Sequence, residues 1–392
     1  MGVVTAALLS AAIFVGTVGA APRAPSASAA APAFSRSCEV AAPGFAACQA
    51  IRNNHARGLA AAPAASTPGG LNPADLRSAY KTPSTTTTAT VAIVDAFNDP
   101  NAESDLGVYR AQFGLPACTT ANGCFKKVNQ TGGSTFPSSN TGWAEEISLD
   151  IDMVSALCST CHILLVEASS SSFANLLAAD DYAAAHASYI SNSWSGGEFS
   201  GETTDDSHFN KAGKVFTFAS GDSGHAAGAQ YPATSRFVVA VGGTHLARST
   251  NTRGWTESAW SSAGSGCSSF ETRPTWQNIS NITSVCARRA EADISAIGDP
   301  ATGVSVYDTF NESGWLVFGG TSVATPIIAT VYAVAGNAST VGGNASFLYS
   351  HTGSFFDVTT GSNGTCSGTM CHAAAGWDGP TGLGTPNGTG GF

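Results

Sequence analysis

Short apolar runs alternate with segments of helical periodicity along most of this chain. The strand-like runs are residues 90–94, 163–166, 188–191, 215–218 and 237–241, and the helical patterns are residues 102–113, 142–157, 172–186 and a long segment from about Ser322. Strands that are apolar on both faces and alternate with helices are typical of a parallel sheet covered on both sides. The sequence therefore predicts an α/β fold with a doubly wound, mostly parallel sheet flanked by helices on both faces.

The N-terminal region divides into three parts by composition. Residues 1–20 are rich in Ala, Val and Leu, carry no charge and end in small residues, which is typical of a secretory signal peptide even though the usual basic start is missing. Residues 21–70 are predicted to form a short prosegment or linker that contains Cys38 and Cys48, and the stretch up to about residue 37 has the composition of a flexible linker. Residues 71–392 form the predicted main domain, which opens with a capped helix start at Leu71–Leu76.

The charge balance excludes one class of partner. The chain has 17 Lys and Arg residues against 27 Asp and Glu residues, a net charge of -10, and no basic cluster. Nucleic-acid binding depends on cationic side chains that neutralise phosphates, so we expect no nucleic-acid partner. No stretch after the signal peptide reaches the ~20 continuous apolar residues of a membrane span, and we expect a secreted, extracellular monomer.

The ten cysteines fall into five close pairs. These are Cys38/Cys48, Cys118/Cys124, Cys158/Cys161, Cys267/Cys286 and Cys366/Cys371. An even count at short separations predicts five local disulfides formed in an oxidising compartment. The alternative is a zinc site at Cys158, Cys161 and His162, but the chain has no second C-x-x-C pair to complete a tetrahedral set.

One predicted helix carries two acids on its apolar side. When residues 145–158 are placed on a helix at about 100° per residue, Glu146 and Asp150 fall in the middle of the apolar arc and are adjacent. The opposite face carries Glu145, Ser148, Asp152 and Ser155, which we expect to be solvated. Two carboxylates buried side by side are costly unless they share a proton or serve chemistry. The alternative is a pair of structural acids that cap a nearby loop.

Two further segments carry candidate site residues. Ser322 stands at the start of a long apolar helix, where backbone N–H groups and the helix dipole favour developing negative charge, although it could equally be a helix-capping serine. Asp222 follows the strand that ends at Phe218. It could make a local turn bond, or it could direct a carboxyl into a site at the carboxyl edge of the sheet.

Together these motifs resemble the sedolisin (serine-carboxyl peptidase) family. Glu146-x-x-x-Asp150, Ser-Gly-Asp222 and Gly-Thr-Ser322 with Pro326 four residues on occur in the family's order, and the resemblance covers roughly residues 71–392. It implies a subtilisin-like fold and a secreted peptidase that acts on peptides or proteins. It also implies that Ser322 is the nucleophile, Glu146 the general base, Asp150 the group that orients Glu146, and Asp222 the oxyanion-hole donor.

The resemblance implies two further sets of residues. The family's substrate-binding strand corresponds to Ser191, Ser193 and Trp194. One structural calcium ion would be bound by the side chains of Asp357 and Asp378 and the carbonyls of Val358, Ala374 and Gly376. Carboxylate and carbonyl oxygens suit calcium, although a Gly-rich turn capped by Asp side chains would look similar, and the family usually has glycine at position 374. The family's large folded prosegment is missing, so inhibition by a prosegment and self-cleavage near residue 70 stay open.

The proposed residues form a coherent chemical set. A serine nucleophile needs a base and the base needs an orienting group, while a carboxyl can donate to an oxyanion only when protonated, which favours activity in acid. One rival is Ser–His–Asp chemistry with Asp95, which ends a strand resembling the Asp-bearing strand of subtilisins. No histidine begins a small-residue helix after Asp95, because residues 142–146 occupy that place. The other rival is a secreted binding protein with a degenerate peptidase fold.

Overall fold

The central sheet of the computed structural model contains eight strands. The structure describes residues 1–3, 33–56 and 68–392, so residues 4–20 of the predicted signal peptide and residues 21–32 and 57–67 of the predicted prosegment or linker lie outside the described residues. The order across the sheet is β12-β11-β9-β7-β4-β6-β5, and β15 also pairs with β11. The strands are β4 (Thr90–Ala96), β5 (Phe125–Asn129), β6 (His162–Ala168), β7 (Tyr189–Asn192), β9 (Val215–Ala219), β11 (Val239–Arg248), β12 (Trp255–Ala259) and β15 (Ile294–Ile297). All of these pairs are parallel except the antiparallel β11–β12 pair, so the predicted sheet is confirmed.

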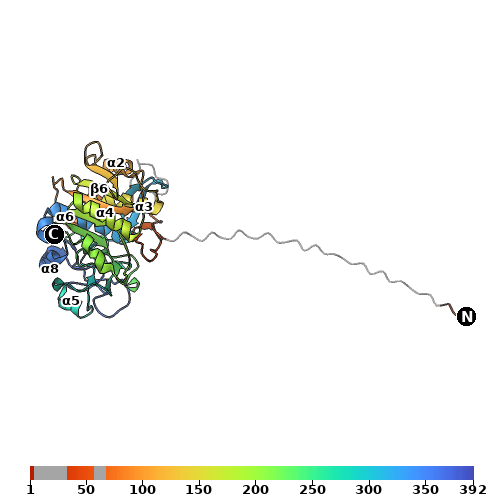
Figure 1. Cartoon of the computed structure of the whole chain (residues 1–392). Helices are drawn as coiled ribbons and strands as arrows, with labels where there is room; N and C mark the ends of the chain where they lie inside the picture. The colour runs from red at the N-terminus through yellow and green to blue at the C-terminus, as the bar shows by residue number, and fades with distance from the viewer. Residues whose placement is uncertain (4–32, 57–67) are drawn as a thin grey trace. The chain divides into compact units, whose positions relative to one another are not determined.

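Helices cover both faces of the sheet, as predicted (Figure 1). One face packs against α1 (Pro73–Tyr80), α2 (Ala102–Gln112), α3 (Thr141–Leu157) and α6 (Thr321–Ala335), and the other packs against α4 (Phe173–His186). Alternate side chains of β4 separate accordingly, because successive residues of a strand point to opposite faces. Val91 and Ile93 lie in the core with α3 and α6, whereas Ala92 and Val94 lie in the core with α4. Among the described residues, no helix is both long and apolar enough to cross a bilayer.

The helix and strand limits agree with the prediction to within a few residues, apart from β11. The predicted capped start is confirmed at α1, where the Asn72 side chain accepts from the N–H groups of Ala74 and Asp75 and the Asp75 side chain accepts from the Asn72 N–H. The strand expected at residues 237–241 begins at Val239 and continues to Arg248. It is longer because its second half forms a hairpin with β12, an antiparallel pairing that the apolar pattern did not indicate.

Residues 33–56 pack into the body of the molecule. β1 (Phe34–Arg36) and β3 (Ile51–Asn53) join β17 (Gly314–Gly319) and β16 (Val304–Asp308) in a second sheet of order β1-β3-β17-β16. The predicted flexible linker was expected to reach residue 37, so its last residues are instead a strand. The reason is a long-range pairing: β1 lies antiparallel to β3, and β3 lies antiparallel to β17, more than 200 residues later in the chain.

The polar face of α3 is buried, which corrects the prediction of a solvated face. The residues concerned are Glu145, Ser148, Asp152 and Ser155, with exposed fractions of 5%, 1%, 1% and 0%. The second sheet and α2 pack over this face and supply partners for its polar groups. The backbone N–H of Tyr307 in β16 donates to Asp152 Oδ2 at 3.1 Å, and Arg52 in β3 forms an ion pair with Glu145 at 3.2 Å.

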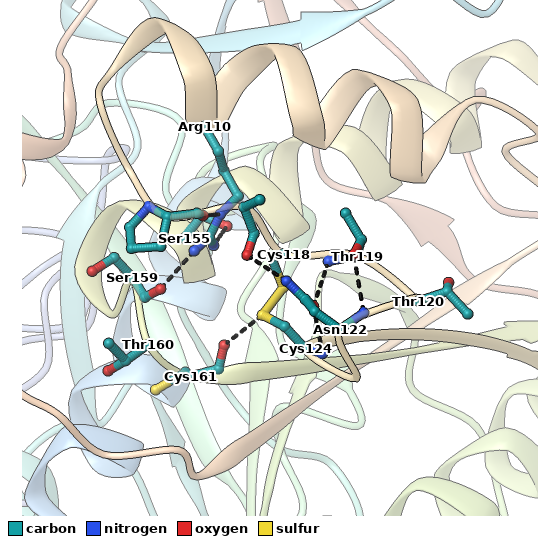
Figure 2. Close-up of a disulfide and its surroundings, with 12 residues drawn as sticks. Arg110, Cys118, Thr119, Thr120, Asn122, Cys124, Ser155, Ser159, Thr160 and Cys161 are labelled. Atoms are coloured by element: carbon teal, nitrogen blue, oxygen red, sulfur yellow. Dashed lines mark hydrogen bonds between the residues drawn. A yellow bond between two sulfur atoms is a disulfide. The ribbon is translucent and has the colours of Figure 1, made fainter.

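All five predicted disulfides are present. The bond between Cys158 and Cys161 occupies the two thiols of the alternative zinc site, so that alternative is wrong. Figure 2 shows the Cys118–Cys124 disulfide beside the end of α3, where Cys124 Sγ lies 3.5 Å from the carbonyl oxygen of Cys161. The Cys118–Cys124 and Cys158–Cys161 disulfides therefore stabilise neighbouring loops.

A buried guanidinium group joins these loops to the helices (Figure 2). Arg110 at the end of α2 is 1% exposed. Its Nε donates to the Pro116 carbonyl at 2.6 Å, Nη1 donates to Ser155 Oγ at 2.8 Å, and Nη2 donates to the Ser159 carbonyl at 2.5 Å. Burial lowers its pKa, and the nearby Asp152 carboxyl opposes that shift. Arg110 thus links α2, the loop that leads to Cys118, and the C-terminal end of α3.

We expect Arg110→Gln to lower the free energy of unfolding by about 3 kcal/mol, because a shorter side chain leaves buried carbonyl groups without donors. Arg248→Gln is the matched control, since the Arg248 side chain is largely exposed and its buried partner Asp75 keeps the Asn72 N–H as a donor. Loss of an ion pair whose cation is exposed to solvent should cost less than about 1 kcal/mol. Unfolding would be followed by circular dichroism with the disulfides intact, and equal losses for the two variants would contradict a structural role for Arg110.

Candidate active site

The site residues meet at the carboxyl edge of the central sheet. Asp95 lies near the end of β4, Ser193 follows β7, and Asp222 follows β9. Because parallel strands end at the same edge, these side chains lie close together, as is usual for sites in α/β sheets. Glu146 on α3 and Ser322 on α6 join them from the helices that cover this face.

The turn from β17 into α6 positions the candidate nucleophile. Gly320 has φ +103°, which a side chain would disfavour, and a Cβ there would lie 2.7 Å from Asp222 Oδ2 and would overlap the carbonyl oxygen of Gln49. Glycine is thus required between the strand and the helix. Ser322 then falls in the first turn of α6, where backbone N–H groups have no partner within the helix.

Pro326 changes the hydrogen bonding of Ser322. Proline has no N–H, so it cannot donate to the carbonyl oxygen four residues earlier, and that carbonyl belongs to Ser322. The hydroxyl of Ser193 lies 3.3 Å from it and supplies a donor. In return the Ser322 hydroxyl donates to the Ser193 carbonyl oxygen at 3.2 Å. The missing N–H at Pro326 therefore leaves room for hydrogen bonds that link Ser322 at the start of α6 to Ser193 after β7.

Glu146 and Asp150 are fully buried, as the helical pattern predicted. Burial raises the pKa of both carboxyls well above the usual range, and the nearby Asp95 carboxyl raises each further. Ser193 Oγ donates to Asp150 Oδ1 at 2.8 Å. Neither oxygen of Glu146 makes a full hydrogen bond within the described residues, but the Ser322 hydroxyl and the Ala50 N–H lie near enough to oppose the rise in its pKa.

Asp95 adds a third acid to the pair. It is fully buried, both of its carboxyl oxygens are without a hydrogen-bond partner in the described residues, and burial and the Glu167 charge raise its pKa well above the usual range. Three carboxyls this close cannot all be ionised, so the carboxyl with the most hydrogen-bond donors nearby carries the negative charge. Glu146 has two nearby donors, Asp150 has one and Asp95 has none. The arrangement therefore favours negative charge on Glu146 and a proton on Asp95.

Asp222 contacts the two residues that precede the candidate nucleophile. Its Oδ1 accepts from the backbone N–H of Thr321 at 2.7 Å and from Thr321 Oγ1 at 2.8 Å. Its Oδ2 has no partner within the described residues and lies against Gly320. Burial raises the pKa of Asp222 to about 7, against the Thr321 hydrogen bonds and the positive charge of Arg36. Below that pH the free oxygen carries a proton that it can donate.

The residues expected in the substrate-binding strand are divided between the site and the core. Ser193 contacts both Asp150 and Ser322, as described above. Ser191 and Trp194 are fully buried, and Trp194 Nε1 donates to the Val94 carbonyl at 2.9 Å while its ring packs against Phe173. Ser191 and Trp194 can therefore contribute only backbone groups to a cleft.

The rival Ser–His–Asp arrangement finds no support in the geometry. Within the described residues, no histidine makes a hydrogen bond to Ser322, and the titratable group beside its hydroxyl is Glu146. Asp95 contacts this acid cluster electrostatically and has no histidine partner there. His225 lies in the short helical turn His225–Ala227, with its Nδ1 3.4 Å from Ser265 Oγ.

The loop predicted to bind calcium brings its residues together. The Gly376 N–H donates to Asp357 Oδ2 at 3.0 Å, and the Ala374 N–H donates to Asp378 Oδ2 at 3.0 Å. Asp357 is exposed and Asp378 is buried, and Val358 is buried beside Asp357. Burial, with a smaller contribution from the Asp357 charge, raises the pKa of Asp378 to about 7. Carboxyl and carbonyl oxygens suit calcium, and a cation would offset the cost of burying this carboxyl. Asp378 Oδ1 also accepts from the Thr381 N–H and hydroxyl, as in the alternative of a turn capped by Asp side chains, so calcium binding stays a prediction.

The sequence did not indicate that residues before position 71 reach the site. The N–H of Gln49 donates to the Ser193 carbonyl at 3.0 Å, and the carbonyl of Gln49 lies against Gly320. Ala50 is fully buried beside Glu146. Only the close pair Cys38/Cys48 hinted at ordered structure here, and a disulfide does not reveal where a segment docks.

Comparison with known proteins gives consistent matches. The model of the subtilase family matches residues 136–346. Kumamolisin of Bacillus sp. (strain MN-32) is 29% identical over 73% of this chain and 56% of its own length, and sedolisin of Pseudomonas sp. (strain 101) is 32% identical over 44% of this chain and 33% of its own. The solved structure of Pseudomonas sedolisin (serine-carboxyl proteinase) with pseudo-iodotyrostatin aligns with a TM-score of 0.69 and 26% identity, covering 82% of this chain and 96% of that one.

The shares of these relatives that the chain covers differ widely. The chain spans about half the length of kumamolisin and a third of that of sedolisin, but nearly all of the solved sedolisin chain. The matched region of the family model contains Glu146, Asp150, Asp222 and Ser322. The chain therefore belongs to the subtilase family, within which it is a member of the sedolisin group.

Proposed function

We propose that this protein is a secreted serine peptidase that hydrolyses peptide bonds in acid through an acyl-enzyme on Ser322. The observation that carries the proposal is that the Ser322 hydroxyl lies beside Glu146, in a buried carboxyl cluster, while the two residues before Ser322 contact Asp222. The Asp222 oxygen beside Gly320 has no hydrogen-bond partner within the described residues. A serine with a base and an oxyanion donor close by is the arrangement that acyl transfer requires.

In the proposed reaction Glu146 takes the proton of Ser322 Oγ as that oxygen attacks the substrate carbonyl carbon. Its raised pKa makes Glu146 a stronger base than an exposed carboxylate. Asp150, in its protonated form, orients Glu146, and Ser193 fixes Asp150 through the 2.8 Å hydrogen bond. The same proton is then given to the leaving amine, and a water molecule repeats the sequence on the acyl-enzyme.

Asp222 would stabilise the oxyanion. Its protonated Oδ2 would donate to the developing negative charge, while Thr321 fixes Oδ1 through two hydrogen bonds. One such donor is typically worth about 2.7–4 kcal/mol of activation free energy. The first turn of α6 adds backbone N–H groups and the positive end of the helix dipole.

The setting of the site also supports secretion and a calcium requirement. Five disulfides need an oxidising compartment, and peptides or proteins are the substrates that the proposed chemistry takes. We infer that Asp357 and Asp378, with carbonyls of Val358, Ala374 and Gly376, bind one calcium ion. The ion would offset the repulsion between the two carboxyls and stabilise the C-terminal loop.

Replacement of the nucleophile tests the proposal. Ser322→Ala should lower the rate of hydrolysis of an unstructured protein in acid by about a thousandfold or more, because no other group can form the acyl-enzyme. The matched control is Ser339→Ala, an exposed serine in the helix Ala338–Val341 that follows α6, which should keep full activity. Products would be identified by mass spectrometry. Undiminished hydrolysis by Ser322→Ala would reject the proposed nucleophile.

Activity should fall as the pH rises through about 7. A carboxyl donates only while protonated, and the pKa of Asp222 is raised to about 7, so the donor is present below that pH and is lost above it. Asp222→Asn keeps the acceptor for Thr321 and replaces the protonated oxygen with an NH2 group that does not titrate. Its kcat/KM should therefore lack the fall near neutrality, even if its rate in acid is lower.

The pH dependence would be measured as kcat/KM across acid and neutral buffers for the wild type, Asp222→Asn and Asp205→Asn. Asp205 lies in the short helix Glu202–His208 away from the site, so its variant should follow the wild type. A wild-type rate that climbs to an alkaline plateau would oppose the assigned role of Asp222. An unchanged fall in Asp222→Asn would oppose it as well.

Calcium should raise the midpoint of thermal unfolding of the wild type relative to a sample with chelator, because an ion that binds only the folded state stabilises it by mass action. Saturation at a hundred times the dissociation constant corresponds to about 2.7 kcal/mol. In Asp378→Asn the calcium-dependent shift should disappear, whatever the basal stability of the variant. A wild-type midpoint that is the same with calcium, with magnesium and with chelator would refute the site.

A further inference from the structure

Residues 46–52, which we call the strap, cross the proposed active site in an extended conformation. Its central residues are almost inaccessible: Cys48 and Ala50 are 0% exposed and Gln49 is 6% exposed. A segment that merely connected two parts of the chain would be expected to run over the surface. The strap is instead buried where a peptide substrate would have to bind.

Backbone pairing fixes the strap on both sides of the nucleophile. On one side β2 (Ala47–Cys48) lies antiparallel to β8 (Trp194–Gly197), and the Gln49 N–H donates to the Ser193 carbonyl at 3.0 Å. On the other side Ile51 pairs with Gly319, one turn before Ser322. Addition of an extended peptide to an exposed strand is a common mode of peptide recognition. The strap thus binds in the manner of a substrate.

One peptide bond of the strap lies between the proposed catalytic groups. The carbonyl oxygen of Gln49 lies against Gly320, on the same side of that glycine as Asp222 Oδ2. The next N–H, that of Ala50, lies near the Glu146 carboxyl and opposes the rise in its pKa. The carbonyl oxygen therefore faces the oxyanion donor and the amide nitrogen faces the base, as a scissile bond requires.

We propose that the strap is the enzyme's own substrate and that Gln49–Ala50 is the bond cut when the protein matures. This inference rests on the proposed function. It differs from self-cleavage near residue 70, which the sequence left open, because Gln49–Ala50 is the bond that lies beside Gly320 and Glu146.

The cleavage step balances with the groups present and one water molecule. Ser322 Oγ bonds to the Gln49 carbonyl carbon while Glu146 takes the hydroxyl proton, and protonated Asp222 donates to the oxyanion. The C–N bond then breaks, and the nitrogen of Ala50 leaves as an amine with the proton from Glu146. Water hydrolyses the ester on Ser322, which frees a carboxylate at Gln49 and restores the serine hydroxyl.

The Gln49 side chain lies at a pocket beside the cleft. Its Nε2 donates to Ser195 Oγ at 3.2 Å and to the Ala47 carbonyl at 3.1 Å. The pocket is lined by both polar and small apolar residues, and Asp222 is among them. The Gln49 amide is thus held by neutral hydrogen-bonding groups, which suit an uncharged polar side chain before the cleaved bond.

The connections of the strap explain how the cut would release it. Both cysteines of the Cys38–Cys48 disulfide precede the cut, so this bond stiffens the N-terminal piece without tethering it to the rest of the chain. That piece is held by the β1–β3 pairing and by Arg36, whose Nη2 donates to the Asp222 carbonyl at 2.9 Å and to Ser223 Oγ at 2.6 Å. These contacts are noncovalent, and the cleaved piece can dissociate.

The test follows the full-length protein, purified near neutral pH and then transferred to acid. Intact mass and terminal peptides would be measured over time at several protein concentrations, alongside hydrolysis of an added peptide. We expect a chain that starts at Ala50 and a peptide that ends at Gln49, formed at a rate independent of protein concentration. Ser322→Ala should stay uncut when it is incubated alone.

A second variant addresses the strap itself. Ala50→Pro removes the N–H beside Glu146 and makes the bond a tertiary amide whose nitrogen leaves as a secondary amine, so cutting should slow at least tenfold and hydrolysis of the added peptide should be delayed with it. The control Ala41→Gly changes the strap's N-terminal approach without touching the bond and should mature at the wild-type rate.

The outcomes separate the two proposals. Wild-type protein that hydrolyses the added peptide while residues 49 and 50 stay joined would overturn the strap inference and leave the proposed function standing. A first cut at another bond, including one near residue 70, would overturn it in the same way. Protein that hydrolyses neither the strap nor the added peptide at any pH would overturn the proposed function and the inference together.

Discussion

The burial of carboxyl groups at the carboxyl edge of the sheet is the constraint on which the site depends. Asp95, Glu146 and Asp150 are all fully buried, and desolvation is the largest cause of their raised pKa values. Carboxyls that hold their protons more tightly in the folded state than in the unfolded state favour folding in acid. That stability is lost as pH rises from the unfolded pKa values towards the folded ones. A site of this kind suits a protein that works in acid, because the same protons that stabilise its fold supply its chemistry.

Hydrogen bonds of the Ser193 hydroxyl connect this acid cluster to the start of α6. The missing N–H at Pro326 leaves the Ser322 carbonyl to the Ser193 hydroxyl, which also donates towards Asp150. One hydroxyl group has one proton, so it serves one of these acceptors at a time. Protonation of Asp150 on Oδ2 would weaken the hydrogen bond from Ser193 to Oδ1 without removing it, because a charged acceptor binds more strongly than a neutral one. The position of the nucleophile is thereby linked to the proton count of the acids.

The sequence predicted the parts of the fold and site that local patterns encode. The strands were apparent from continuous apolar runs, and the burial of Glu146 and Asp150 followed from their place in an apolar helical arc. The buried position of Asp152 and the partly buried position of Arg52 depended on partners more than 150 residues away, because β16 lies over α3 and β17 pairs with β3. The docking of the strap depended in the same way on β8 and β17, which no periodicity in residues 46–52 reveals.

The Ser193 carbonyl oxygen competes with Glu146 for the hydroxyl proton of Ser322. It accepts from both the Ser322 hydroxyl and the Gln49 N–H, at 3.2 Å and 3.0 Å, while Glu146 makes no full hydrogen bond within the described residues. To transfer its proton, the hydroxyl must turn from that carbonyl to Glu146. A carboxylate attracts it more strongly than a neutral carbonyl does, so ionisation of Glu146 drives the turn. The proposed reaction therefore needs one acid of the site ionised while Asp222 keeps its proton, which confines activity to a window bounded on both sides by carboxyl titrations.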